Sequence, residues 1–370
     1  MRKVHAAVLR QAGGPFHIEP VRLSPPRPDE VVVRIVAAGM CHADILVRNQ
    51  EVGPPPPIVL GHEGAGIVVE LGSDVCELEI GDHVVLSFAF CGACDRCLSG
   101  EQAYCEHAFA MNWSAADRGG HKALHDAHGE PLKDYFFGQS SFSTYATVNQ
   151  RSAIRVPKDA PLELLGPLGC GVQTGAGAVL NTLRVKTGSS FLCLGAGAVG
   201  MSALLASKIC GAAQAIVVDL VQSRLDLARE LGATHAINGQ APDVLGTIRE
   251  LTGDGTNFVL DTTGVSEVIS MGIESLAPRG TIGLVAGIGG KKAEFDITRL
   301  FSGGRTIKGI VEGDSVARVF IPELVALYLQ GRFPFDKLVK FYNFDEINQA
   351  ADDSIKGMAI KPILRISEMT

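Results

Sequence analysis

The pattern of hydrophobic and polar positions changes near Pro167. From Val4 to about Thr147, short runs rich in β-branched residues, such as VVVRIVAAG and GAGIVVELG, are separated by glycine and proline. That pattern predicts a strand-rich domain with irregular loops. Beyond Pro167, to about residue 310, apolar strands alternate with stretches of helical periodicity. This alternation predicts a parallel sheet with helices on both faces.

The end of the chain is expected to return to the first domain. It begins with FIPELVALYLQG, an amphipathic helix, and closes with AIKPILRI, a strand. We therefore predict an α/β protein with two domains. We expect residues 1–170 and 311–370 to form a β-rich domain, and residues 171–310 to form a domain with a doubly wound parallel sheet. The length of 370 residues fits two cores rather than one.

The composition and charge of the chain indicate which kinds of partner to expect. With 46% hydrophobic and 20% charged residues, the chain is typical of a globular protein. The net charge of -7 is spread without a basic stripe, so nucleic acid is not an expected partner. The N-terminal segment lacks an apolar core of signal-peptide length, and no run approaches the roughly 18 apolar residues of a membrane span. These features predict a cytoplasmic protein with a small-molecule substrate and no membrane partner.

Residues 195–200 read GAGAVG, between the apolar strand FLCL and a helix. Glycine-rich turns are common, but this context is specific for a dinucleotide-binding turn. Gly195 allows the tight turn, Gly197 lets the backbone approach a diphosphate, and Gly200 lets the helix pack against the strand. The motif predicts hydride transfer with a nicotinamide cofactor.

Asp219 ends the next strand, AIVVD. A carboxylate there accepts hydrogen bonds from both hydroxyls of the adenosine ribose and repels a 2′-phosphate, so NAD is favoured over NADP. Arg224, on the following helix, is placed to brace the ribose. The alternative is that Asp219 only caps the next helix.

Four of the nine cysteines lie close together, and they are Cys91, Cys94, Cys97 and Cys105. Without an export signal, such clustering favours metal over disulfides. Four thiolates close a tetrahedral shell around zinc with no open position, which makes the site structural. An iron–sulfur cluster is the alternative, but nothing else in the sequence points to electron transfer.

A second group is dispersed along the chain. Cys41 ends a predicted strand, His62 lies in GHEGAG, and Cys170 lies in PLGCGVQ. Each of them alone is more typical of a packed core residue. Together, two thiolates, one imidazole and an open fourth position would form a catalytic zinc site. Such a metal would polarise an alcohol oxygen and lower its pKa beside the nicotinamide.

The segment at residues 61–75 has the pattern G-H-E-x2-G-x5-G-x2-V. It resembles the zinc signature of the medium-chain alcohol dehydrogenases, and the four-cysteine segment, GCG and GAGAVG follow in that family's order. The resemblance covers essentially the whole chain and implies a GroES-like catalytic domain with a Rossmann domain. Segments such as FFGQSSFSTYA and ELLGPLGCGVQTGAGA look most like bacterial aryl-alcohol (benzyl alcohol) dehydrogenases. Geraniol dehydrogenases are nearly as similar.

The resemblance implies roles in the catalytic zinc site. Cys41, His62 and Cys170 would bind the zinc ion. Asp44 would orient the His62 imidazole, as metal-bound histidines generally require. Glu63 would act as an alternate ligand during ligand exchange. A second, structural zinc would complete two per subunit.

The resemblance also implies roles around the cofactor. His42 and Lys361 match cationic positions that contact the diphosphate. Thr174 and Val199 would press the nicotinamide towards the metal.

For the substrate pocket, the resemblance implies Phe88, because an aromatic wall suits a flat benzylic or allylic alcohol. A plain core role is the alternative for this residue. Val52 and Ile288 lie in segments expected to complete the pocket. The family resemblance further predicts a homodimer or homotetramer.

Ala43 departs from the family pattern. The family normally has serine or threonine two residues after the first zinc cysteine, and some members have histidine three positions further. Here these positions are Ala43 and Leu46, and neither carries a proton. Positioned acid–base groups contribute about 10²- to 10⁴-fold in rate. Turnover is therefore expected to be reduced unless water beside Ala43, or His42, moves the proton.

The leading hypothesis is a zinc-dependent NAD oxidoreductase that interconverts aromatic (benzylic) or allylic primary alcohols and their aldehydes. One alternative is a glutathione-dependent formaldehyde dehydrogenase, although the region after Phe109 offers no clear cluster of cations to hold the glutathione carboxylates. Another is a catalytically impaired protein that binds NAD and zinc. A polyol or threonine dehydrogenase fits less well.

Overall fold

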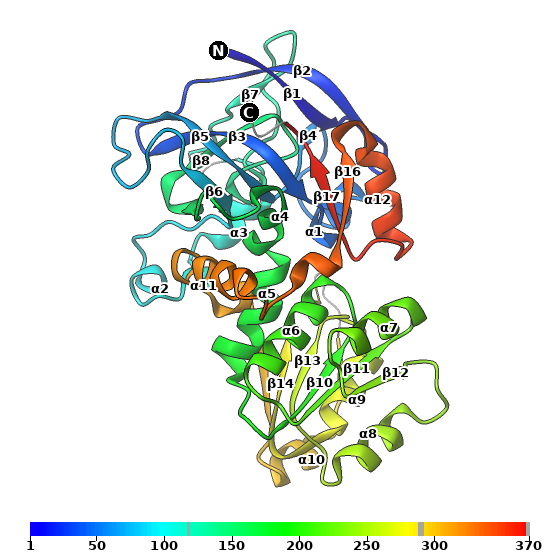
Figure 1. Ribbon diagram of the computed structural model, residues 1–370. Helices are drawn as coiled ribbons and strands as arrows, with labels where there is room; N and C mark the ends of the chain where they lie inside the picture. The colour runs from blue at the N-terminus through cyan, green and yellow to red at the C-terminus, as the bar shows by residue number, and fades with distance from the viewer. Residues whose placement is uncertain (117–118, 288–291, 368–370) are drawn as a thin grey trace. The chain divides into compact units, whose positions relative to one another are not determined.

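The computed structural model describes residues 1–116, 119–287 and 292–367. It divides into two compact units, and each is considered by itself (Figure 1). The first unit comprises Met1–Cys170, Val316–Gly331 and Asp336–Thr370. The second unit comprises Gly171–Ser315 and Arg332–Phe335. Within the described residues, no helix combines the length and apolar character that a membrane crossing requires.

A seven-stranded sheet is the centre of the first unit. Its order is β16-β17-β3-β5-β6-β9, and β8 also pairs with β3. The strands are β3 (Glu30–Gly39), β5 (Glu63–Leu71), β6 (His83–Leu86), β8 (Tyr145–Asn149), β9 (Ala153–Arg155), β16 (Val339–Asn343) and β17 (Lys361–Arg365). β3 is buried almost throughout, which its sequence EVVVRIVAAG suits because valine and isoleucine pack well on a pleated surface. The predicted C-terminal strand is confirmed as β17, which pairs antiparallel with β3.

A smaller antiparallel sheet completes the strands of this unit, in the order β4-β1-β2-β7. Its strands are β1 (Arg2–Leu9), β2 (Phe16–Leu23), β4 (Ile58–Val59) and β7 (Leu124–His125). The helices of the unit are α1 (His42–Arg48), α2 (Asp95–Leu98), α3 (Ala108–Trp113), α4 (Leu162–Leu165), α11 (Ala317–Leu329) and α12 (Ile347–Ile355). Short 3₁₀ turns are η1 (Gln102–Tyr104), η2 (Phe136–Gly138), η3 (Gln150–Ser152), η4 (Gly166–Gly169), η7 (Phe335–Leu338) and η8 (Phe344–Glu346).

The predicted helix at FIPELVALYLQG is confirmed as α11, but it begins earlier, at Ala317. Its buried face includes Phe320, Ile321 and Leu324. Pro322 lies inside the helix and removes one backbone hydrogen bond there. Burial of the apolar face explains why the helix continues across the proline.

The second unit is built on a parallel sheet in the order β12-β11-β10-β13-β14-β15. Its strands are β10 (Ser190–Leu194), β11 (Gln214–Asp219), β12 (His235–Asn238), β13 (Thr256–Asp261), β14 (Leu276–Leu284) and β15 (Thr306–Gly309). Its helical segments are α5 (Gly171–Gly177), η5 (Ala178–Leu183), α6 (Ala198–Ile209), α7 (Gln222–Glu230), α8 (Val244–Thr252), α9 (Ser266–Glu274), α10 (Ile297–Ser302) and η6 (Glu312–Asp314). The order reverses at β10, the first strand, as in doubly wound dinucleotide-binding folds. The alternation of strands and helices confirms the predicted α/β class.

Candidate metal centres and cofactor-binding turn

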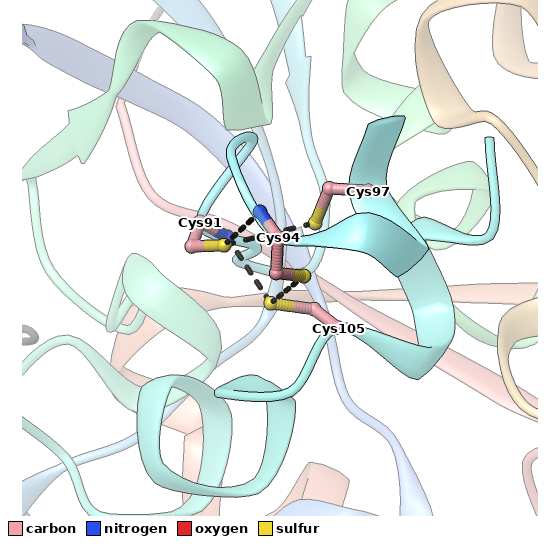
Figure 2. A group of neighbouring side chains, drawn as sticks. All are labelled: Cys91, Cys94, Cys97 and Cys105. Carbon is pink, nitrogen blue, oxygen red and sulfur yellow. Dashed lines mark hydrogen bonds between the residues drawn. The ribbon is translucent and has the colours of Figure 1, made fainter. Parts of the chain in front are cut away.

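The four clustered cysteines converge on one point in the first unit. Their sulfur atoms lie within 4.8 Å of one another, and Figure 2 shows the four side chains facing a common centre. The Cys91 and Cys97 sulfurs are 3.9 Å apart, as are those of Cys94 and Cys105. A tetrahedral shell with zinc–sulfur bonds of about 2.3 Å places sulfur atoms about 3.8 Å apart. The cluster therefore fits a zinc ion held by four thiolates.

Backbone N–H groups donate to cysteine sulfur atoms in this cluster and so stabilise their thiolate form. Those of Ala93 and Cys94 point at the Cys91 sulfur, at 3.4 and 3.3 Å. The N–H groups of Glu106 and Cys97 lower the pKa of the Cys94 thiol to about 6. Deprotonated sulfur is the form that binds metal, so these bonds favour the liganding state at Cys91 and Cys94, whereas burial raises the pKa of the Cys97 and Cys105 thiols.

Cys41, His62, Glu63 and Cys170 form a second cluster, again with ligand atoms within 4.8 Å of one another. They come from the start of α1, the start of β5 and the segment after η4. The Nε2 atom of His62 is buried and has no hydrogen-bond partner among the described residues. A hydrogen bond with Cys170, above all, lowers the pKa of Cys41 well below its usual range. An imidazole nitrogen without a partner, next to thiolates, is the donor set of a metal site.

Asp44 fixes the direction of the His62 imidazole. Its Oδ1 atom lies 3.2 Å from His62 Nδ1, and it also accepts the Gly61 N–H at 3.0 Å. Its Oδ2 atom accepts the Cys41 N–H at 2.9 Å. Because a carboxylate only accepts, the contact selects the tautomer with its proton on Nδ1 and leaves the Nε2 lone pair for a metal.

Glu63 and Lys361 form a buried ion pair at this cluster. The Lys361 ammonium donates to both carboxylate oxygens at 2.8 Å and to Met40 O at 3.2 Å. Burial alone would lower the pKa of Lys361, but the Glu63 carboxylate raises it above its ordinary value, so the ammonium stays charged. The structure thus places Lys361 against Glu63 of this cluster, and its contact with the cofactor diphosphate stays a prediction.

The predicted proton-relay positions lie on α1. His42 is exposed, whereas Ala43 and Leu46 are half-buried. No hydroxyl is present at either of the latter two positions. His42 follows Cys41 directly, and its contact with a diphosphate stays a prediction.

The glycine-rich turn joins β10 to α6 in the second unit. A Cβ atom on Gly195, which has a φ of +98°, would lie 2.4 Å from Thr262 Oγ1. A Cβ on Gly200 would lie 1.9 Å from the carbonyl oxygen of Gly195. A Cβ on Gly197 would instead meet nothing within 4 Å, and no side chain caps α6 there. The open space beside Gly197 and the lack of a side-chain cap at the start of α6 fit the approach of a diphosphate.

Asp219 lies beside this turn. Its Oδ2 atom accepts the Ala196 N–H at 2.6 Å, and its Oδ1 atom accepts the Val221 N–H at 2.8 Å. Arg224 is half-buried on α7, and its Nε atom has no partner among the described residues. Asp219 thus lies beside the glycine turn, and Arg224 lies on the helix that follows β11. Their contacts with ribose stay predictions.

Thr174 and Val199 lie on neighbouring helices. A Cβ on Gly175 would lie 2.0 Å from the Val199 carbonyl oxygen, so α5 and α6 touch at this point. The Thr174 hydroxyl lies 3.4 Å from a Glu312 carboxylate oxygen. Their roles at a nicotinamide stay predictions.

The predicted substrate-pocket residues are dispersed. Phe88 is buried, with its ring centroid 6.1 Å from that of Phe90. Val52 is half-buried. Ile288 lies outside the described residues. A cavity of about 600 Å³ in the second unit lies at the amino ends of β10, β11 and β13. That is the opposite end of the sheet from the glycine turn, so this cavity is not the cofactor site.

Three aromatic residues near His62 were not anticipated from the sequence. The Phe137 and Phe136 ring centroids lie 4.5 and 5.3 Å from that of His62. Trp113 packs on both phenylalanines. The run YFFG at residues 135–138 was the signal available, but nothing local indicated that it packs against His62.

Comparisons with known proteins cover both units. Residues 27–158 match the family "Alcohol dehydrogenase GroES-like domain", and residues 198–328 match "Zinc-binding dehydrogenase". Geraniol dehydrogenase of Castellaniella defragrans is 45% identical over 362 residues, which cover 97% of this chain and 96% of that protein. Benzyl alcohol dehydrogenase from Acinetobacter calcoaceticus has a similar crystal structure, with a TM-score of 0.96 and 51% identity over 99% of this chain and 100% of that one. An alcohol dehydrogenase zinc-binding domain protein from Burkholderia ambifaria reaches a TM-score of 0.98 with 59% identity, over 99% and 100% of the two chains.

These matches place the chain among the zinc-binding dehydrogenases. More specifically, it belongs to the zinc-dependent medium-chain alcohol dehydrogenase family. The predicted family and the predicted pairing of a GroES-like domain with a Rossmann domain are thereby confirmed.

The glycine turn generates a paired prediction. Gly197→Ala should leave the stability of the cofactor-free protein nearly unchanged, because its Cβ meets open space. It should weaken NADH binding roughly tenfold or more, about 1.4 kcal/mol, because the methyl group fills the space a diphosphate needs. Gly200→Ala should destabilise the protein itself by about 1–3 kcal/mol, because its Cβ meets backbone. Thermal unfolding and fluorescence titration with NADH measure the two effects. Unchanged NADH affinity in Gly197→Ala would show that the diphosphate binds elsewhere.

Proposed function

We propose that this chain is an NAD-dependent alcohol dehydrogenase that interconverts aromatic (benzylic) or allylic primary alcohols and their aldehydes. The observation that carries the proposal is the cluster of Cys41, His62 and Cys170, in which the buried Nε2 atom of His62 lacks a partner among the described residues. That donor set leaves a position for a substrate oxygen on a tetrahedral metal.

A zinc ion held by Cys41, His62 and Cys170 would supply a Lewis acid that polarises the alcohol oxygen and lowers the pKa of the alcohol. Residues of the chain itself set the net charge at this site and the tautomer of His62. Two thiolates balance the charge of a divalent ion, and Glu63 would add an excess negative charge. Lys361 cancels that excess through the ion pair at 2.8 Å. Asp44 keeps the imidazole in the tautomer that leaves Nε2 free to bind.

The preference for NAD rests on Asp219. Each of its oxygens accepts one backbone N–H, and a carboxylate oxygen can accept a second bond. Ribose hydroxyls would therefore find acceptors beside the glycine turn, whereas a 2′-phosphate would meet a like charge. NAD held there would supply the acceptor for a hydride from the alcohol carbon.

The substrate class is supported by the relatives. Geraniol and benzyl alcohol, which give their names to two of them, both carry the hydroxyl group on a carbon next to a π system. Phe88 is a proposed aromatic wall for such a substrate, and Val52 is a proposed neighbour. Assembly as a homodimer or homotetramer stays a prediction.

The route of the proton is the open step of the proposal. Without a hydroxyl at Ala43, the proton of the alcohol must leave through water or through another side chain. His42 is the nearest candidate in sequence because it follows Cys41 and is exposed at the start of α1.

A substrate panel tests the proposed function. Benzyl, cinnamyl, geranyl and simple aliphatic alcohols are compared with NAD and with NADP, and reduction of the cofactor is followed at 340 nm. The highest kcat/KM is expected for a benzylic or allylic alcohol with NAD, and a zinc chelator should abolish it. A preference for ethanol would refute the substrate class, and a preference for NADP would contradict the role of Asp219.

A substitution at Ala43 tests the missing hydroxyl. Ala43→Thr should raise the turnover of benzyl alcohol with NAD, by about tenfold or more if proton transfer limits the rate. Ala43→Val is the matched control, because valine has nearly the same shape as threonine and no hydroxyl. Steady-state kcat is measured for both variants. If threonine gives no gain over valine, proton transfer does not limit this enzyme.

A further inference from the structure

The loop of residues 135–140, here called the aromatic loop, has an unusual backbone. Tyr135, Phe137, Gly138 and Ser140 have positive φ values of 60°, 50°, 70° and 50°. Bulky residues rarely adopt this left-handed conformation. They keep it only where the surrounding structure imposes it, and such positions cluster at functional sites. The loop therefore requires contacts strong enough to hold it.

Those contacts lead to the segment that carries His62. The Gln139 amide donates to His62 O at 2.9 Å and accepts the Gly64 N–H at 3.1 Å. The Ser140 hydroxyl donates to Val59 O at 2.6 Å. Gln139 is 2% exposed, so its bonds are shielded from water. The aromatic loop is thus fastened to the backbone on both sides of His62.

The same loop covers the His62 side chain. The Phe137 ring stacks on the imidazole, with centroids 4.5 Å apart and planes inclined by 27°. The Phe136 ring meets the imidazole edge to face at 5.3 Å and 88°. Trp113 backs Phe137, with centroids 5.1 Å apart. His62 is 1% exposed, so these rings form part of its immediate surroundings.

Asp44 and the aromatic loop constrain different motions of the imidazole. The contact between Asp44 Oδ1 and Nδ1 anchors one atom of the ring. By itself it does not fix rotation of the ring about the line that joins these two atoms, and Nε2, which lies off that line, moves with such a rotation. A ring stacked on the imidazole face restricts this rotation.

We propose that Phe137 is a positioning residue for His62: its ring holds the plane of the imidazole so that Nε2 stays aimed at Cys41 and Cys170. Trp113 acts through Phe137 by keeping it in place. The backbone conformation of the aromatic loop is what carries the Phe137 ring onto the imidazole. The inference rests on the proposed function only in that the cluster of Cys41, His62 and Cys170 holds a metal ion.

The test is the rate at which the purified full-length protein releases zinc to a chromogenic chelator. Phe137→Leu should speed release from the cluster of Cys41, His62 and Cys170 about threefold to tenfold, the range expected for loss of an aromatic pair. Release from the four-cysteine cluster should be unchanged, and it serves as an internal standard. Phe137→Tyr keeps the ring and should restore the slow rate.

Phe16→Leu is the matched control. Phe16 is also a buried phenylalanine of the first unit, but its ring contacts Phe142 at 6.0 Å and not His62. This variant should release both zinc ions at the wild-type rate. If Phe137→Leu does not fold, Trp113→Leu carries the test, with faster release expected from the same cluster only.

A second readout separates positioning from substrate contact. In cobalt-substituted protein, the visible absorption bands of the metal should shift in Phe137→Leu and not in Phe16→Leu. Unchanged zinc release and unchanged bands in Phe137→Leu, with only KM for benzyl alcohol altered, would overturn the proposal and make the ring a substrate wall. Neither readout uses alcohol or NAD. A wild-type protein that holds zinc but oxidises no alcohol would therefore refute the proposed function and leave this inference standing.

Discussion

The arrangement around the second cluster depends on one buried carboxylate. Asp44 is fully buried, and it accepts the N–H groups of Cys41 and Gly61 while its Oδ1 atom faces His62 Nδ1. These contacts tie the end of β3, the start of α1 and the start of β5 to one side chain. A buried carboxylate is costly unless it is well hydrogen-bonded, so the three segments are held together by the same bonds that align the ligand atoms.

Much of the fold could be predicted from the sequence because its signals are local. The alternation of strands and helices fixes the α/β class, and GAGAVG marks the turn after β10 because only glycine suits Gly195 and Gly200 there. The close spacing of the four cysteines likewise predicts that they form one cluster. Other elements depend on contacts that the local sequence does not show. One is α11, which begins at Ala317 and continues across Pro322 because its apolar face is buried.

The surroundings of His62 could not be predicted, because they join residues far apart in the chain. The resemblance assigns Lys361 to a cofactor diphosphate, and nothing in the sequence indicates that it is buried against Glu63. Phe137 reads as one of several aromatic residues, yet it stacks on the imidazole. Such contacts follow from the pairing of β17 with β3 and from the course of the aromatic loop, and no local pattern encodes either.

The central claim is that Cys41, His62 and Cys170 hold a zinc ion that is distinct from the ion of the four-cysteine cluster. The most direct measurement is the zinc content per chain of the purified wild-type protein and of Cys41→Ala, by elemental analysis. The account predicts two ions in the wild type and one in the variant, with the fold retained. One ion in the wild type, or two in Cys41→Ala, would contradict it.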